Sequence, residues 1–215
     1  RGLGDVYKRQ TYLWLQLDQN IRKKDAPSLY KNSSGNSVTQ RPSSFLKNYI
    51  NGSFDGGFNI EWVLDTQGNP LKYTINQTMM RVDLPESLSP NEIFKFKIKW
   101  WYNINNRLEY GGRSGYEYFE GDGNKVYTIA QFFPRLCVYN DVEGWQNYQF
   151  WGNGEFALEF GDYQVNITVP SDHIMEATGT LQNPKEVLTK EEYKRFIASK
   201  SSFEKPIIIC LLYTS

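Results

Sequence analysis

The chain has 215 residues, with 24 basic side chains, 24 acidic side chains and a single histidine. Zero net charge argues against a nucleic-acid-binding protein, which would need a clustered basic surplus. The longest apolar run, residues 207–212, is far shorter than the roughly 20 residues of a membrane-spanning helix, so no membrane span is predicted. Aromatic residues make up 16% of the chain, and this enrichment favours β-strands.

Both ends of the sequence resemble translated sequencing-adapter read-through, which flanks truncated genes in assembled environmental sequence. The strings are "RGLGDVYKRQ" at the start and "CLLYTS" at the end. We therefore expect residues 1–10 and 210–215 to be non-native and exclude them from fold reasoning, as one would a fusion scar. Residues 11–209 are expected to form one β-domain of a longer protein.

Alternating apolar residues predict the first strands. In residues 11–20, Leu13, Leu15 and Leu17 share one face. Residues 25–57 are crowded with Ser, Asn, Gly and Pro, which predicts a loop-rich insertion. Phe58, Ile60, Trp62 and Leu64 alternate along the next predicted strand, 58–64, and the turn "DTQGNP" should return the chain to a partner strand at 71–85.

The segment 91–102 gives the clearest strand pattern. Four apolar side chains point one way and three lysines the other: Phe94, Phe96, Ile98 and Trp100 against Lys95, Lys97 and Lys99. A nucleic-acid groove is one interpretation of the lysines, but a half-buried strand with a solvated face is favoured. A hairpin turn is predicted at 120–125, followed by a strand at 126–133.

Two further strand patterns occupy residues 154–170, and "PIIIC" at 206–210 suggests a closing strand. Between them lies the one good helix, near 190–199, where Thr189 and Glu192 form a capping box. Many short strands without a βαβ rhythm predict an all-β fold. We expect an antiparallel β-sandwich or saddle-like domain with one late helix.

Few residues are candidates for catalysis. His173 is the only histidine, so this sequence cannot build a two-histidine zinc site. Its neighbours in "SDH" would point to opposite faces of a strand, and a surface turn after Pro170 is favoured over a catalytic relay. Cys137 is interpreted as a buried apolar residue, and Asp141 and Glu143 as turn formers. No catalytic residue and no metal ligand is predicted.

The run "TIAQFFPRLCVYNDVEGWQNYQFWGNGEFALEFGDYQVNITVPSDHIMEATGTLQNPKEVLT" (128–189) resembles the N-terminal domain of bacterial gluzincin zinc aminopeptidases, the membrane-alanyl-aminopeptidase family. Residues 12–20 and 96–119 resemble earlier strands of that family. The resemblance implies a two-part metallopeptidase, active as a whole protein, that removes N-terminal residues from peptides. Its catalytic domain would carry zinc, HExxH and a GxMEN-type motif, and this sequence contains neither motif. The chain alone is therefore expected to hold no cofactor and to be inactive.

The same resemblance implies one site residue. Gln131 matches the family position that helps to hold the free α-amine of the substrate at the edge of the cleft. Arg135 and Asp141 are interpreted as structural, as an ion pair that pins the turn. The expected partners are the protein's own catalytic domain and, in the parent, a peptide; a periplasmic or secreted parent is expected. The alternative is a non-catalytic carbohydrate-binding β-sandwich that uses Trp145, Tyr148 and Trp151.

Overall fold

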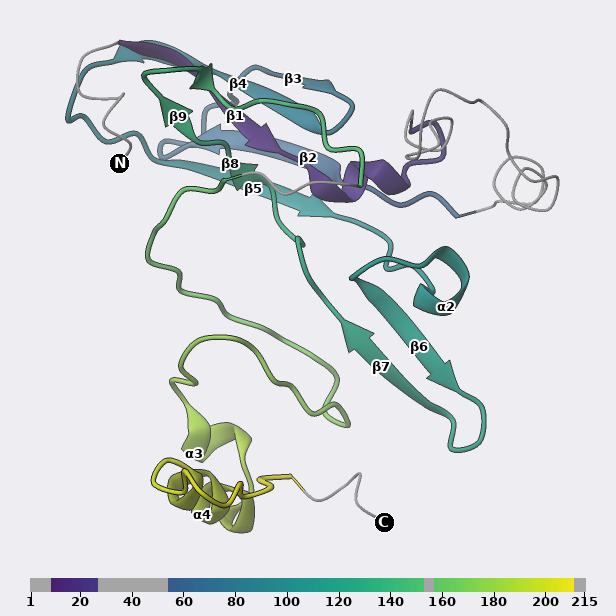
Figure 1. The fold of residues 1–215 in the computed structure, drawn as a ribbon. Coiled ribbons are helices and arrows are strands. Elements are labelled where there is room, and N and C mark those ends of the chain that lie inside the picture. Colours follow the sequence, from purple (N-terminus) through teal and green to yellow (C-terminus); the bar gives the residue numbers. More distant parts are fainter. Residues whose placement is uncertain (1–8, 27–53, 153–156, 211–215) are drawn as a thin grey trace, which may run out of the picture. The chain divides into compact units, whose positions relative to one another are not determined.

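The computed structural model describes residues 9–26, 54–152 and 157–210. Most of the predicted loop-rich segment 25–57 lies outside the described residues, as do most of the two terminal strings. The chain divides into two compact units, Arg1–Asp162 and Tyr163–Ser215, and each is described by itself. Figure 1 gives the element labels used below.

All the described strands lie in the first unit, and every ladder is antiparallel. The largest sheet has the order β3-β4-β1-β8, and three two-stranded sheets pair β2 with β5, β6 with β7, and β9 with β10. The strands are β1 (Gln10–Gln16), β2 (Asn59–Asp65), β3 (Tyr73–Asn76), β4 (Met79–Leu88), β5 (Phe96–Trp101), β6 (Gly115–Phe119), β7 (Asn124–Thr128), β8 (Arg135–Leu136), β9 (Tyr139–Asn140) and β10 (Gly144–Trp145).

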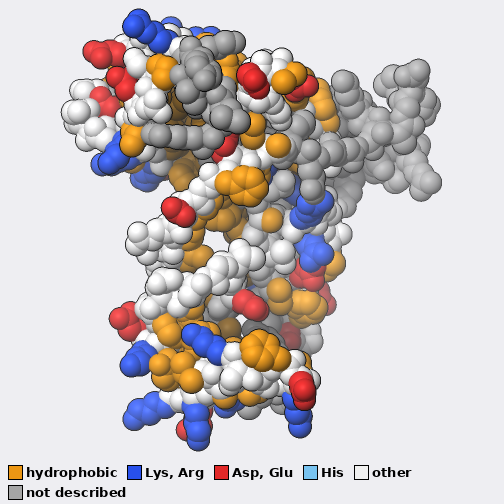
Figure 2. Space-filling view, turned by 60° about the vertical axis from the view of Figure 1, so that its left-hand side comes forward, with side chains coloured by type: hydrophobic (Ala, Val, Ile, Leu, Met, Phe, Trp, Pro, Cys, Tyr) orange, Lys and Arg blue, Asp and Glu red, His pale blue; other side chains and the backbone are white. Residues whose placement is uncertain are grey.

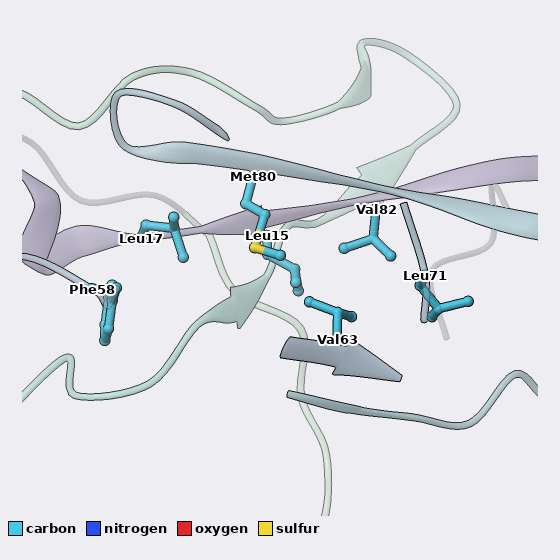
Figure 3. Packing of buried hydrophobic residues seen from close by; sticks show 7 residues of the cluster. All are labelled: Leu15, Leu17, Phe58, Val63, Leu71, Met80 and Val82. Atoms are coloured by element: carbon cyan, nitrogen blue, oxygen red, sulfur yellow. The ribbon is translucent and has the colours of Figure 1, made fainter. Parts of the chain in front are cut away.

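The core lies between the four-stranded sheet and the β2–β5 pair. Figure 3 shows Leu15, Met80 and Val82 of the larger sheet pointing toward Val63 of β2, with Leu71 beside them. Met80 and Val82 are both fully buried. At the start of β2 Phe58 closes the core, with its ring edge-on to Tyr102 at 5.6 Å. Two antiparallel layers that share one apolar core make this unit the predicted β-sandwich.

The predicted partner of residues 58–64 is wrong. The chain returns beside that strand only at the turn, where Pro70 bridges Leu64 and the Leu71 amide donates to the Val63 carbonyl. Most of segment 71–85 instead folds into a β3–β4 hairpin that turns at Gln77 and Thr78, and the strand partner of β2 is β5. A register shift between Ile60 and Trp62 also interrupts the predicted alternation, so that Val63 is buried and Trp62 faces outward. A one-residue bulge moves every later side chain to the other face. On β5 the alternation is confirmed, with the three lysines exposed.

Four further predicted strands are corrected. The strand at 126–133 ends at Thr128. No strand forms in the described parts of 154–170, where the only ladder contact is an isolated bridge between Leu158 and Cys137, and none forms at 206–210. Alternation specifies which side chains would share a face, but a strand also needs a neighbouring backbone to bond. The hairpin turn at 120–125 is confirmed between β6 and β7.

Helices are few and short. The first unit has α2 (Arg107–Tyr110), and the second has α3 (Pro184–Val187) and α4 (Lys190–Ser199). The capping box of α4 is confirmed in both directions: the Thr189 hydroxyl accepts from the Glu192 amide, and the Glu192 carboxylate accepts from the Thr189 amide. Among the described helices, none has the length and apolarity needed to cross a bilayer. The all-β fold with one late helix is confirmed.

Candidate functional site

A short polar segment is buried in the first unit. Directly after β1, the 3₁₀ helix Asp18–Arg22 buries Asp18, Gln19 and Asn20, whose exposed fractions are 1%, 2% and 2%. Polar side chains are this deeply buried only where they find partners. Each of the three binds a part of the chain that is remote in sequence, so this segment organises the unit around itself.

Asn20 joins two strands at their ends. Its Nδ2 donates to the Gln77 carbonyl at 2.7 Å, in the tight β3–β4 turn, and its Oδ1 accepts from the Phe58 amide at 2.8 Å. Gln77 has a φ of 54°, a left-handed conformation that only a few per cent of non-glycine residues adopt. The Asn20 amide therefore satisfies the turn and the first residue before β2 with one side chain.

Gln19 holds the segment that follows β7. Its Nε2 donates to the carbonyls of Ala130 and Gln131, at 3.0 and 3.1 Å. The Ser114 hydroxyl also bonds to Ala130, accepting from its amide at 2.9 Å and donating to its carbonyl at 2.8 Å. The next carbonyl, of Phe132, accepts from Trp100 Nε1 at 3.0 Å. Three consecutive carbonyls are thus fixed by side chains where no strand ladder fixes them.

Gln131 lies at the middle of this fixed segment. Its φ of 52° is again left-handed, and its side chain is half-buried. Non-glycine residues in this conformation cost of order 1–3 kcal/mol and persist only where the surroundings over-determine them, often at functional sites. The hydrogen bonds of Gln19 and Ser114 hold the backbone of Ala130 and Gln131 in this conformation. The strand predicted at 126–133 ends at Thr128, and the left-handed backbone of Gln131 prevents an extended strand from continuing to 133.

Arg22 binds the side-chain oxygen of Gln19. Its Nη1 donates to Gln19 Oε1 at 2.8 Å, and burial lowers the pKa of the guanidinium while the nearby Tyr102 opposes that shift. Burial likewise raises the pKa of Tyr102, and Arg22 opposes it. A side chain at Gly112, which has a φ of 93°, would place its Cβ 2.3 Å from Arg22 Nη2. A side chain there would have to displace the flexible end of Arg22, and the positive φ would strain any residue other than glycine.

The predicted pair of Arg135 with Asp141 is wrong. Arg135 binds Asp18 through Nε at 2.8 Å and through Nη2 at 2.7 Å, both to Oδ2. Asp141 lies in an exposed turn where the Asn140 side chain accepts the amides of Val142 and Glu143, which confirms the turn itself. Arg135 stands opposite Gln16 across the β1–β8 ladder, which places it near Asp18, two residues past the end of β1.

The Asp18 site is electrostatically costly. Burial raises the pKa of its carboxyl despite the charge and hydrogen bonds of Arg135. Its second oxygen, Oδ1, and Gln16 Nε2 are buried with no hydrogen-bond partner among the described residues. Cys137 is buried next to this pair, and burial, with a smaller effect of Asp18, raises the pKa of its thiol to about 12. The predicted role of Cys137 as a buried apolar residue is confirmed, because a thiol with this pKa stays protonated.

The other candidate residues are dispersed. The predicted turn after Pro170 is confirmed by the bond from the His173 amide to the Pro170 carbonyl. His173 Nδ1 also lies 2.8 Å from Asp172 Oδ1, a contact that was not predicted. In the described parts of the chain, no three His, Cys, Asp or Glu side chains form a group that fits a metal ion. The zinc implied by the resemblance is therefore not assigned to any of them.

The three aromatic residues of the alternative interpretation differ in their surroundings. Trp145 packs edge-on against Tyr139 at 5.3 Å and is half-buried, while Tyr148 and Trp151 are 57% and 37% exposed.

The buried segment 18–20 and its contact with Gln131 were not predicted. Residues 18–20 were predicted to continue the strand at 11–20, but β1 ends at Gln16 and they form a 3₁₀ helix instead. The only local signal was Leu17, an apolar residue that continues the buried face past the end of β1.

Comparisons of this chain with protein-family models, curated proteins and solved structures found no match.

Proposed function

We propose that the chain is the N-terminal β-domain of a zinc aminopeptidase of the gluzincin type and forms one wall of its substrate cleft. The observation that carries the proposal is the resemblance of residues 128–189, which contain Gln131. In the proposed parent, a downstream catalytic domain supplies the zinc, its ligands and the general base. The β-domain of this chain would hold the substrate's N-terminal amine in place through the polar side chain of Gln131.

The surroundings of Gln131 suit this role. A side-chain amide can accept a hydrogen bond from an ammonium group without placing an isolated charge in a partly buried site. The side chains of Gln19, Ser114 and Trp100 donate hydrogen bonds to the backbone carbonyls of residues 130–132. These bonds fix the backbone position from which the Gln131 side chain extends. Fixed supports of this kind are what a substrate-positioning group requires, because loosely held groups lose much of their effect.

The test begins with the gene. The reading frame downstream of residue 209 should encode HExxH and a more distant glutamate, and the complete protein should release N-terminal residues in a chelator-sensitive reaction. In that protein, Gln131→Ala should raise KM for free-amine substrates while the zinc content stays at the parent's value. Gln182→Ala, an exposed glutamine bonded only to the Thr180 carbonyl, is the matched control. An unrelated downstream module, or no rise in KM, would contradict the proposal.

A carbohydrate-binding module is the second candidate, supported by the exposure of Tyr148 and Trp151. Aromatic rings that remain at the surface can stack on sugar rings. A stop codon soon after residue 209, together with glycan binding that Trp151→Ala abolishes, would favour this candidate over the first.

A further inference from the structure

Apolar side chains reach the described surface in many places (Figure 2), and one stretch of them has the pattern of a strand. At the start of the second unit, the exposed fractions of Tyr163, Val165, Ile167 and Val169 are 68%, 54%, 49% and 41%. Gln164, Asn166 and Thr168 alternate with them and are also exposed. The segment 163–169 therefore has the alternating apolar and polar faces that are typical of a half-buried strand.

The segment has no sheet around it. No strand is assigned to residues 163–169, and residues 164–169 make no hydrogen bond with the rest of the described chain. Four of its seven residues are β-branched, and it contains no charge, no proline and no glycine. Uncharged segments of this length and composition pair readily with other strands. The amides and carbonyls of residues 164–169, which bond to no other part of the described chain, form a template for such pairing.

Two other open strand edges of the described chain carry a charge that discourages pairing. Among the described residues, β5 and β7 each have one neighbour only, and both strands contain lysine: Lys97 and Lys99 in β5, and Lys125 in β7. Lysine on an edge strand opposes association because pairing would bury its charge. Segment 163–169 lacks this protection, as does the outer strand β3. The segment is longer than β3 and, unlike β3, has no assigned strand partner on either side, so more of its backbone is open to pairing.

We propose that segment 163–169 pairs with the same segment of a second copy of this chain, as an antiparallel two-stranded ladder centred on Asn166. Two-fold symmetry about Asn166 places Tyr163 opposite Val169 and Val165 opposite Ile167. Aromatic with β-branched and β-branched with β-branched are favourable cross-strand pairs. On the other face, Gln164 stands opposite Thr168, and no like charges meet. The contact is isologous, which is the commonest symmetry of homodimers.

Disulfide trapping tests the register. In a Cys210→Ser background, Asn166→Cys places two thiols directly opposite each other, about 4.5–5.5 Å apart at Cα, within disulfide range. Gln164→Cys is the matched control, because its two copies would lie about 14 Å apart along the ladder. Buried Cys137 should not compete, since burial raises the pKa of its thiol to about 12. We expect covalent dimers on mild oxidation of the first variant and none of the second.

Sedimentation velocity over a dilution series tests the association itself. The unmodified chain should sediment as a dimer that dissociates on dilution, and Ile167→Lys should raise its dissociation constant at least about tenfold, because two apolar cross-strand pairs are lost. Val142→Lys adds the same charge at an exposed turn residue of the first unit and should leave the constant unchanged. Circular dichroism checks that each variant keeps the parent spectrum.

Three results would overturn the proposal. The first is a monomer at every concentration, which would also be the outcome if the segment paired within its own chain. The second is equal cross-linking of the Asn166→Cys and Gln164→Cys variants, which would show contact without this register. The third is an unchanged dissociation constant for Ile167→Lys, which would place the contact on another surface. None of these results bears on the downstream reading frame, so the proposed function is tested separately.

Discussion

Replacing Arg135 by methionine tests the buried ion pair most directly. Methionine keeps much of the apolar stem and removes the charge, which leaves Asp18 with an exposed fraction of 1% and no cationic partner. Removing one partner of a buried pair costs about 3–5 kcal/mol. The Arg135 side chain is itself 17% exposed, so water can replace part of what is lost. We therefore expect the lower end of that range, about 3 kcal/mol of unfolding free energy.

Urea unfolding followed by tryptophan fluorescence measures this loss in the first unit alone, since all six tryptophans lie there: Trp14, Trp62, Trp100, Trp101, Trp145 and Trp151. With a typical slope for urea, the midpoint should fall by about 1–2 M. Arg107→Met is the matched control, because Arg107 pairs with Glu117 at 2.7 Å but is 42% exposed. Surface pairs of that kind contribute about 0–1 kcal/mol.

The pH dependence of the loss has a defined sign. The pKa of Asp18 is raised above its ordinary value of 3.8 by burial, and Arg135 opposes that rise, so the Arg135→Met substitution raises the folded-state pKa further. A carboxyl with a raised folded-state pKa costs stability at neutral pH, and the cost disappears as the pH falls through that pKa. The deficit of Arg135→Met should therefore shrink on acidification toward pH 4. A deficit no larger than that of Arg107→Met, or one that stays constant with pH, would refute this reasoning.

Four further outcomes are expected. Thr189→Ala should lower the stability of α4 by about 0.5–2 kcal/mol through loss of its N-cap, and thermal melting followed by circular dichroism at the helix band measures it; an unchanged melt would contradict the capping box. Gln131→Gly should unfold within about 1 kcal/mol of the parent, because glycine accepts a positive φ at little cost, whereas Gln131→Val should lose about 1–3 kcal/mol; equal urea midpoints would contradict a strained backbone. Cys137 should resist alkylation at pH 8 in the folded chain and react only in urea, because its thiol has a pKa of about 12; rapid native labelling of Cys137, located by peptide mapping, would contradict its burial. The purified chain should bind no stoichiometric zinc and show no aminopeptidase turnover, while the full-length parent does both; one zinc per chain by metal analysis would show that the catalytic machinery has been misplaced.

Local pattern was sufficient for much of the fold. Alternation placed Leu15 and Leu17 in the core and turned the lysines of β5 outward, and the capping box located α4, because these features depend on neighbours two to four residues away. The same reasoning recognised Cys137 as a buried residue and His173 as part of a turn. Zero net charge and a single histidine were likewise properties of the sequence alone.

Pairing and polar burial were decided by the tertiary structure. Nothing near Asn59–Asp65 in the sequence specifies that its neighbour is β5 and not β3, and a bulge at residue 61 reverses the expected faces of the residues after it. Asp18, Gln19 and Asn20 were predicted to end a strand, but they form a buried 3₁₀ helix whose side chains bond to partners 38 to 117 positions away. Polar burial depends on such remote hydrogen bonds, and therefore the support of Gln131 becomes visible only when the chain is folded.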